Sequence, residues 1–281
     1  MPQKRAVAIH DISCLGKCSL TCALPILSAA GHECCVIPTA VLSTHTGGFS
    51  GYTFRDLSDD ILPIVAHWER QGIRADLLYS GYLGSIRQCE SVAEAVRRIR
   101  KESSLFVCDP AMADNGRLYA GFSAEFVPAM LGLCRQADIL VPNLTEACLL
   151  TGQDYPGQRV PNAFCEALVK QLYEQTGASI VLTGAGETDE TVGAAVYDGT
   201  RMTLCLSRRI PAVFHGTGDV FASALCAALL SGNVLTAAAD FAAEFTVRSI
   251  EKTLRDTPDR RYGVHFETQL GFLAQTLNPD P

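Results

Sequence analysis

The sequence predicts an α/β fold with a mostly parallel central sheet and helices on both faces. Strand and helix signals alternate along the chain, and several strand segments are short, wholly apolar and followed by polar loop residues. Strands of this kind are typical of a parallel sheet that is buried on both sides. Of the 281 residues, 48% are hydrophobic and 19% are charged, which excludes a disordered chain. No linker or repeat interrupts the pattern, so we expect residues 1–281 to form one domain.

The first half of the chain alternates regularly between the two kinds of element. Apolar runs predict strands, and segments that stop at a glycine predict helices. We expect strands at 5–10, 33–38, 76–79 and 105–108, and helices at 19–30, 59–71 and 88–102.

The second half continues the pattern and adds a hairpin. Two alternating segments, 193–197 and 202–206, flank Asp198-Gly199, a dipeptide that favours a tight turn. Two or three long helices should close the chain from Gly218 onward. We further expect strands at 139–141 and 179–182, and helices at 146–150 and 162–175.

Net charge and cysteine content exclude some kinds of partner and of binding site. The net charge of −7 disfavours nucleic acid or an anionic membrane as the main partner. No signal peptide or membrane-spanning run is evident, so we expect a cytoplasmic protein with free thiols. The twelve cysteines include no C-x-x-C pair, and Cys14, Cys18 and Cys22 could share one helical face as small buried side chains.

The most informative motif is His215-Gly-Thr-Gly-Asp219, which precedes a long apolar helix. Its two glycines allow backbone N–H groups to point toward one place, and the helix N-terminus adds positive charge there. A carboxylate beside such an anion site would repel a phosphate, unless it accepts a proton from an attacking hydroxyl. The alternative is that Thr217 or Asp219 simply caps the helix.

Acidic residues follow two neighbouring strands. Asp109 and Asp114 come after one strand, and Asn143 and Glu146 come after the next. Carboxylates gathered at one sheet edge suit Mg²⁺, which binds a few carboxylates together with water and substrate phosphates. The alternative is ordinary turn formation and helix capping by the same residues.

Two further loops could orient a small ring. Ser43-Thr-His-Thr-Gly47 and Ser80-Gly-Tyr-Leu-Gly-Ser85 combine hydroxyl groups with an imidazole and a phenol. The Ser/Gly-rich stretch near Gly47 to Gly51 could equally be a mobile flap.

Taken together, these residues resemble the pyridoxal (vitamin B6) kinases of the ribokinase-like superfamily. The resemblance covers nearly the whole chain and predicts the three-layer sandwich of that superfamily. It rests on the two loops above, on Gly216-Thr-Gly-Asp219, on residues 108–116 and on Pro142-Asn-Leu-Thr-Glu146.

The resemblance implies ATP-dependent phosphorylation of the 5'-hydroxymethyl group of pyridoxal, pyridoxine or pyridoxamine, with ATP and Mg²⁺ bound in the site. It makes Asp219 the catalytic base, and Gly216, Thr217 and Gly218 the anion hole. It assigns pyridine-ring contacts to His45, Thr46 and Tyr82, and metal contacts to Asp114 and Glu146. It places Asp109, Asn143, Glu146, Thr183 and Gly184 at the nucleotide.

The sequence departs from the family at two points. Many members carry Gln-Ser-His after the first strand, where this chain reads His10-Asp11-Ile-Ser13, so either Asp11 or Ser13 takes the serine's contact with the ring. Val141 stands near a position where some members have a threonine close to a monovalent cation, which weakens the case for such a cation here.

Two alternative functions stay open, together with an expectation about assembly. A hydroxymethylpyrimidine kinase would act on a similar ring, although such kinases commonly carry cysteine where this chain has Asp219. A catalytically silent vitamin-binding protein would need no base. The resemblance also implies a homodimer.

Overall fold

A nine-stranded mixed sheet forms the middle layer of the molecule. The computed structural model describes residues 3–157, 159–256 and 259–278. The strands run across the sheet in the order β11-β10-β9-β8-β5-β4-β1-β2-β3. Their bounds are β1 Arg5–Ser13, β2 Glu33–Leu42, β3 Phe54–Asp56, β4 Ala75–Ser80, β5 Arg100–Cys108, β8 Ile139–Leu140, β9 Ser179–Ala185, β10 Thr191–Tyr197 and β11 Met202–Arg208.

The six strands from β2 to β9 in this order pair in parallel, as the apolar strand segments predicted. Antiparallel strands extend the sheet at both sides. β3 pairs with the end of β2, and β10 pairs with both β9 and β11. The predicted hairpin around Asp198-Gly199 is therefore confirmed.

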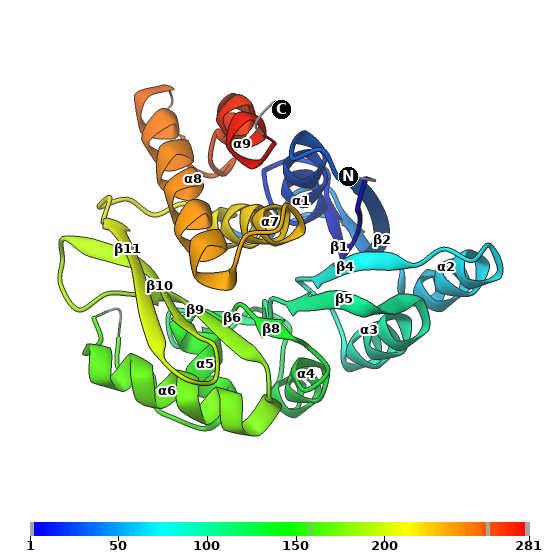
Figure 1. Ribbon diagram of the computed structural model, residues 1–281, viewed down its shortest axis with the longest axis horizontal. Helices are drawn as coiled ribbons and strands as arrows, with labels where there is room; N and C mark the ends of the chain where they lie inside the picture. The colour runs from blue at the N-terminus through cyan, green and yellow to red at the C-terminus, as the bar shows by residue number, and fades with distance from the viewer. Residues whose placement is uncertain (1–2, 158, 257–258, 279–281) are drawn as a thin grey trace.

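Helices cover both faces of the sheet and complete three layers (Figure 1). One face carries α1 Leu20–Ala29, α7 Thr217–Leu230, α8 Leu235–Asp256 and α9 Leu270–Leu277, with the short 3-10 helix η1 Phe266–Gln269. The other face carries α2 Ser58–Arg70, α3 Ile86–Ile99, α4 Phe126–Cys134, α5 Leu144–Thr151 and α6 Asn162–Thr176. The predicted α/β class with helices on both faces is confirmed. No helix in the described ranges is long and apolar enough to cross a membrane.

Several elements differ from the sequence-based expectation. α3 ends at Ile99 rather than near 102, because Arg100 turns to an extended conformation and already pairs with Ala75 in the sheet. Cys14 and Cys18 precede α1, so the three cysteines do not share a helical face.

Four elements were not expected: the helix α4, the edge strand β3, and the two strands of a hairpin, β6 Ala113–Asp114 and β7 Arg117–Leu118. α4 contains a proline and a glycine, which are poor helix formers. It is held instead by burial of Phe126, Met130 and Leu133 against its neighbours.

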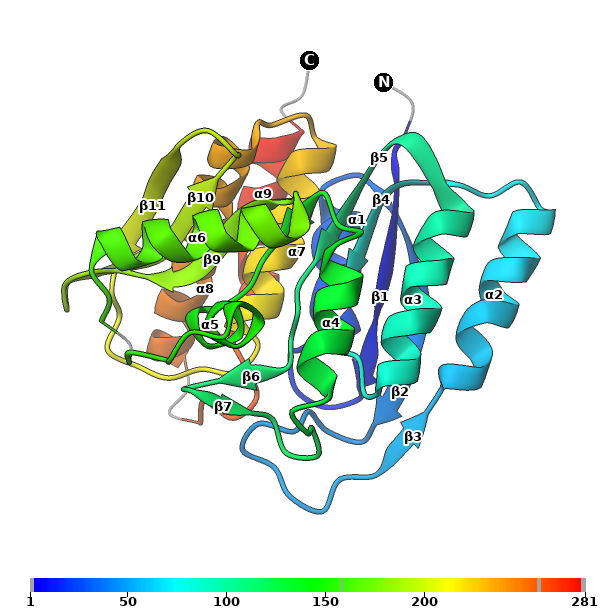
Figure 2. The same cartoon turned by 90° about the horizontal axis from the view of Figure 1, so that it is seen from below.

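The loops that follow the parallel strands meet at one edge of the sheet. Figure 2 shows the β6–β7 hairpin and the loop after β2 at the same end of the molecule, opposite the start of β1. β11 runs parallel to β9, so the segment from β11 to α7 starts from this edge as well. In open α/β sheets this edge is where ligands bind.

Candidate active site

The turn into α7 requires a glycine at its first position. Gly216 is the N-cap residue and has a φ of 75°, in the left-handed region. A Cβ at this position would lie 2.0 Å from the backbone oxygen of Lys17, so a larger residue cannot fit. At Gly218, the second residue of the helix, nothing lies within 4 Å of where a Cβ would be. The loop therefore packs closely on its inner side and leaves open space beside Gly218.

No side chain caps the N-terminus of α7. The alternative interpretation, in which Thr217 or Asp219 serves as the cap, is therefore wrong. The first N–H groups of a helix have no partners within the helix, and the helix dipole makes that end positive. α7 is 14 residues long, and a glycine turn precedes it. The uncapped N-terminus of such a helix can bind an anion.

Asp219 lies in the first turn of this helix and has an unusual pKa. Burial of its carboxylate, with the nearby charge of Asp11 as a second cause, raises its pKa to about 7. A hydrogen bond from the backbone N–H of Ser19 acts in the opposite direction. A carboxylate whose pKa lies near 7 can accept a proton from a substrate at neutral pH.

Asp11 and Ser13, the two alternatives for a ring contact, lie together at the end of β1. The Ser13 hydroxyl donates a hydrogen bond to Asp11 Oδ2 at 3.0 Å, and both residues are buried. Burial raises the pKa of Asp11, although the hydroxyls of Ser19 and Ser13 lower it. The sequence left open whether Asp11 or Ser13 contacts the ring, and the structure joins the two side chains by a hydrogen bond.

Tyr82 lies near this pair, in the loop after β4. Burial and then the charge of Asp11 raise the pKa of its phenol to about 12. Its ring centroid is 5.6 Å from that of Phe122, so the two aromatic rings form a wall near the carboxylate of Asp11. This arrangement is suited to holding a small aromatic ring.

His45 holds the loop after β2 against the C-terminal part of the chain. Its Nε2 donates to the backbone oxygen of Arg261 at 2.6 Å, while Nδ1 accepts from the N–H of Gly47 at 3.1 Å. Its ring also lies 5.4 Å from that of His215, directly before the glycine loop. Both nitrogens are therefore engaged by the protein. Contacts of His45 and of the exposed Thr46 with a substrate ring stay predictions.

Glu146 and Asn143 form a capping box at the start of α5. Asn143 Oδ1 accepts from the Glu146 N–H at 3.0 Å, and Glu146 Oε2 accepts from the Asn143 N–H at 2.9 Å. Glu146 Oε1 also accepts from the N–H of Met112 at 3.0 Å. Burial raises the pKa of Glu146 to about 8 despite these donors. The capping interpretation is correct here, and it fixes a carboxylate at the sheet edge.

Asp109 and Asp114 lie near Glu146 but differ in exposure. Asp109 is buried at the end of β5, and burial, followed by the charges of Glu146 and Asp219, raises its pKa. Asp114 is exposed on the hairpin and accepts the Asn115 N–H at 2.8 Å. The charge of Asp114 in turn contributes to the raised pKa of Glu146. One electrostatic cluster thus joins Asp219, Asp109, Glu146 and Asp114.

The four carboxylates of this cluster supply the negative charge of an Mg²⁺ site but not, among the residues described, a full set of protein ligands. No lysine, arginine or histidine within the described ranges forms an ion pair with any of the four carboxylates, so a cation would relieve their repulsion. No group of three or more acidic, histidine or cysteine side chains is placed to hold a metal in this part of the chain. An ion would need ligands from phosphate and water too, as Mg²⁺ usually does.

Thr183 and Gly184 meet the same cluster from β9. Thr183 pairs with Asn143 in an isolated parallel bridge, and its N–H donates to the oxygen of Pro142 at 2.8 Å. Gly184 has a φ of 80°, and a Cβ at this position would lie 3.7 Å from Leu144 Cδ1. The structure thus brings these two predicted nucleotide residues next to the capping box.

Two residues near the site carry no functional signal in the sequence. Ser19 lowers the pKa of both Asp11 and Asp219, but its place before a helix suggests only an ordinary cap. Tyr119 follows the unexpected hairpin, and burial, then Glu146 and Asp109, raise the pKa of its phenol. A tyrosine in a loop gives no signal of such neighbours.

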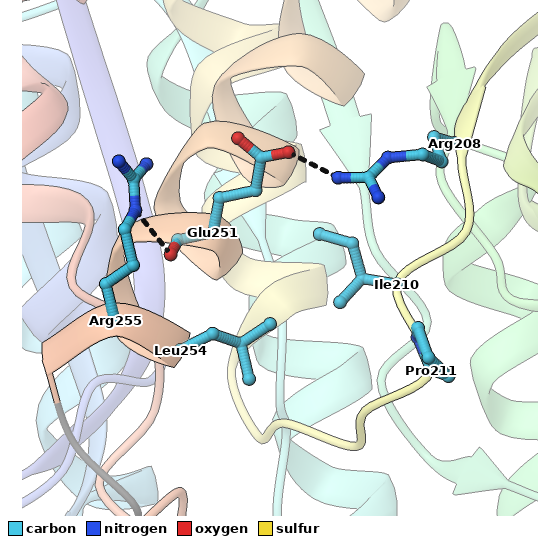
Figure 3. A pocket seen from close by; sticks show the side chains of 6 residues that line it. All are labelled: Arg208, Ile210, Pro211, Glu251, Leu254 and Arg255. Carbon is cyan, nitrogen blue, oxygen red and sulfur yellow. Dashed lines mark hydrogen bonds and ion pairs between the residues drawn. The ribbon is translucent and has the colours of Figure 1, made fainter.

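Two shallow grooves flank the segment that leads from β11 to the glycine loop. The first, of about 490 Å³, lies between this segment and α8 (Figure 3). Ile210, Pro211 and Leu254 give it apolar walls, and Arg208 pairs with Glu251 across it at 2.9 Å. The second, of about 440 Å³, is lined by residues 209–213 and Arg260.

A proton acceptor next to an anion site suits the transfer of a phosphoryl group to a hydroxyl. On a sheet of this topology, these features define a phosphotransferase of the ribokinase-like fold that acts on an alcohol group. The family model described as phosphomethylpyrimidine kinase matches residues 23–260. The chain belongs to this family.

Solved structures and curated relatives agree with this assignment. A pyridoxal kinase from Lactobacillus plantarum is 33% identical, with a TM-score of 0.90, over 99% of this chain and 98% of that chain. A Bacteroides thetaiotaomicron protein crystallised with pyridoxal is 36% identical, with a TM-score of 0.90, over 96% of each chain. A pyridoxal kinase of Deinococcus radiodurans is 30% identical over 215 residues, 70% of this chain and 69% of the relative. The resemblance to pyridoxal kinases is confirmed.

Proposed function

We propose that this protein transfers the γ-phosphoryl group of ATP to the 5'-hydroxymethyl group of a vitamin B6 compound. The observation that carries the proposal is Asp219, a carboxylate with a pKa of about 7 beside the uncapped N-terminus of α7. The relatives named pyridoxal kinase, and the one crystallised with pyridoxal, support the choice of substrate.

Asp219 would act as the general base. A primary hydroxyl is a weak nucleophile, so removing its proton as it attacks phosphorus helps the transfer. The free N–H groups around Gly216, Thr217 and Gly218 would stabilise the charge on the transferred group. The open space beside Gly218 leaves room for that group.

The pyridine ring would lie between β1 and the loop after β4. Tyr82 and Phe122 provide an aromatic wall, and Asp11 with Ser13 provides polar contacts for ring substituents. The loop with His45 and Thr46 would cover the ring from the opposite side.

ATP would lie along the sheet edge from the acidic cluster to the groove beside α8. Asp114 and Glu146 would hold Mg²⁺ together with phosphate and water ligands, and the ion would neutralise phosphate charge when bound. Asp109, Asn143, Thr183 and Gly184 would contact the phosphates or the ribose. The apolar groove of Ile210, Pro211 and Leu254 suits the adenine ring, because it lies on the segment that runs into Gly216.

A hydroxymethylpyrimidine kinase is the second candidate, and the description of the matching family favours it. Its substrate is also a small aromatic ring with a hydroxymethyl group, so the same base and anion site would serve. Asp219 in place of cysteine still favours the B6 compounds.

The test is ADP release, in a coupled assay with Mg·ATP, on pyridoxal, pyridoxine, pyridoxamine and hydroxymethylpyrimidine separately. We expect turnover with at least one B6 compound and a kcat/KM well above that for the pyrimidine. A preference for the pyrimidine would support the second candidate. No ADP above the background ATPase rate with any compound would leave a binding protein as the better description.

A further inference from the structure

The loop between β2 and β3, residues 43–53, lies at the sheet edge where the site is built (Figure 2). Its base is closed by two hydrogen bonds. The Ser43 N–H donates to the oxygen of Thr53 at 3.2 Å, and the Thr53 N–H donates to the Ser43 hydroxyl at 2.9 Å. Further along, the His45 ring donates to the oxygen of Arg261 at 2.6 Å. The segment that follows His45 depends on other contacts for its position.

Gly47, in that segment, contacts two imidazole rings. Its N–H donates to His45 Nδ1 at 3.1 Å. A Cβ on Gly47 would lie 2.4 Å from His215 Nδ1 and 2.8 Å from His215 Cε1, so the His215 ring occupies the place of a side chain. The φ of Gly47 lies outside the left-handed region, so its backbone conformation alone does not call for glycine. The His215 ring is therefore what requires glycine at this position.

The backbone of His215 is confined as closely as its ring. It leads directly into Gly216, where a Cβ would lie 2.0 Å from the oxygen of Lys17, and its own oxygen lies 3.4 Å from where a Cβ on Gly263 would be. The His215 ring makes no hydrogen bond within the described ranges, so it holds the β2–β3 loop by packing. Closely packed groups transmit a displacement, because no free space absorbs it. A shift of Gly47 therefore displaces the residue that precedes the glycine loop.

We propose that His215 is a positioning residue that seats the β2–β3 loop against the glycine loop, and so fixes the separation of the vitamer ring and the transferred phosphoryl group. The proposal rests on the kinase function proposed above, in which the β2–β3 loop covers the ring and the glycine loop holds the phosphoryl group. It assigns the His215 ring no contact with substrate. Phosphoryl transfer depends on the placement of both reactants, and a displacement of about 1 Å lowers the rate about 100-fold.

Gly47→Ala and His215→Ala, alone and together, form the test. In Gly47→Ala the added methyl group clashes with the His215 ring and pushes the loop away. The KM for the preferred B6 compound should therefore rise, and kcat should fall about 10- to 100-fold. The KM for ATP should stay within about twofold, because the groove beside α8 is unchanged. His215→Ala leaves the loop without its seat, and kcat/KM for the B6 compound should fall about tenfold.

The double variant distinguishes seating by His215 from general damage to the loop. With the ring removed, the methyl group at position 47 meets no obstacle, so Gly47→Ala should change kcat/KM less than about twofold in the His215→Ala background. A general defect of the loop would instead lower kcat/KM equally in both backgrounds. The same cycle is measured on the Kd of pyridoxal without ATP, which requires no turnover. Melting temperatures check that each variant folds.

Two variants away from the site serve as controls and should match the wild type. His67→Ala removes an exposed imidazole of α2, and Gly132→Ala adds a methyl group where nothing lies within 4 Å of a Cβ. Equal losses from Gly47→Ala in the two backgrounds, or wild-type kinetics of His215→Ala, would overturn the proposal. The second outcome decides even if Gly47→Ala does not fold.

Failure of the proposed function gives a different result. A wild-type protein that binds pyridoxal but releases no ADP would contradict the kinase function, while the cycle on Kd still tests whether His215 seats the loop. A wild-type protein that neither binds pyridoxal nor releases ADP would contradict both proposals.

Discussion

At the scale of single residues, Asp219 illustrates how its surroundings give a common side chain an uncommon property. An aspartate in water has a pKa of 3.8, but burial and the neighbouring Asp11 raise that of Asp219 to about 7. The same position on an exposed helix would carry a permanently ionised carboxylate, a much weaker proton acceptor. The residue's chemistry therefore depends on groups from β1 and from the turn before α1.

Asp219→Asn tests this role directly. Asparagine has the same size but cannot accept the proton, so kcat should fall about 10²- to 10⁴-fold while both substrates still bind. Because α7 has no side-chain cap, no cap is lost, and the melting temperature should not decrease. Melting temperature and kcat should be measured on one preparation. Near wild-type turnover in a folded protein would rule out Asp219 as the base.

At the scale of elements, the start of α7 combines a tight turn with an open helix end. Gly216 is required because its inner side abuts the backbone of Lys17, whereas Gly218 has free space around it. The two glycines of the motif therefore serve different purposes. The first shapes the backbone, and in the proposed mechanism the second would keep the place of the transferred phosphoryl group clear.

Single alanine substitutions separate these purposes. Gly216→Ala should destabilise the protein by about 1–3 kcal/mol or more, because of the steric clash and the positive φ. Gly218→Ala should fold as well as the wild type or better, since alanine favours the helix. Its kcat should still fall at least tenfold, because the methyl group would occupy the anion site. Thermal melts and initial rates check both, and full activity of Gly218→Ala would argue against an anion at that point.

At the scale of the whole molecule, the sheet concentrates negative charge at one edge. Asp11 lies in β1, Asp109 follows β5, Glu146 lies in the helix after β8, and Asp219 lies in the helix after β11. No cation within the described residues pairs with any of them. Burial raises the pKa of all four carboxyls. The ligand-free fold thus holds acids that bind protons more tightly than they do in the unfolded chain.

Because the folded chain binds these protons more tightly than the unfolded chain, its free energy of unfolding depends on pH. A carboxyl with a raised pKa favours the folded state when protonated, and that contribution is lost as pH rises from the unfolded pKa to the folded one. For Asp219 the window runs from 3.8 to about 7, and for Glu146 from 4.5 to about 8. The melting temperature without ligands should therefore fall between pH 5 and pH 8. Mg·ATP should restore it at pH 8, and Asp219→Asn should flatten the slope. A melting temperature that rises over this range would contradict the pKa assignments.

The sequence by itself determined the layered α/β class, the sheet-edge location of the site and the motif around Asp219, because apolar periodicity and glycine spacing are local properties. It did not determine α4, whose helix depends on burial rather than on propensity, or the early end of α3, which sheet pairing imposes. Whether Asp219 caps a helix was decided only by the tertiary structure, which also joins Asp11 and Ser13 in one hydrogen bond. The influence of Asp11 on the pKa of Asp219 likewise arises only there, because the two residues are distant in the chain. Contacts between distant segments depend on the packing of the whole molecule, which no local pattern encodes.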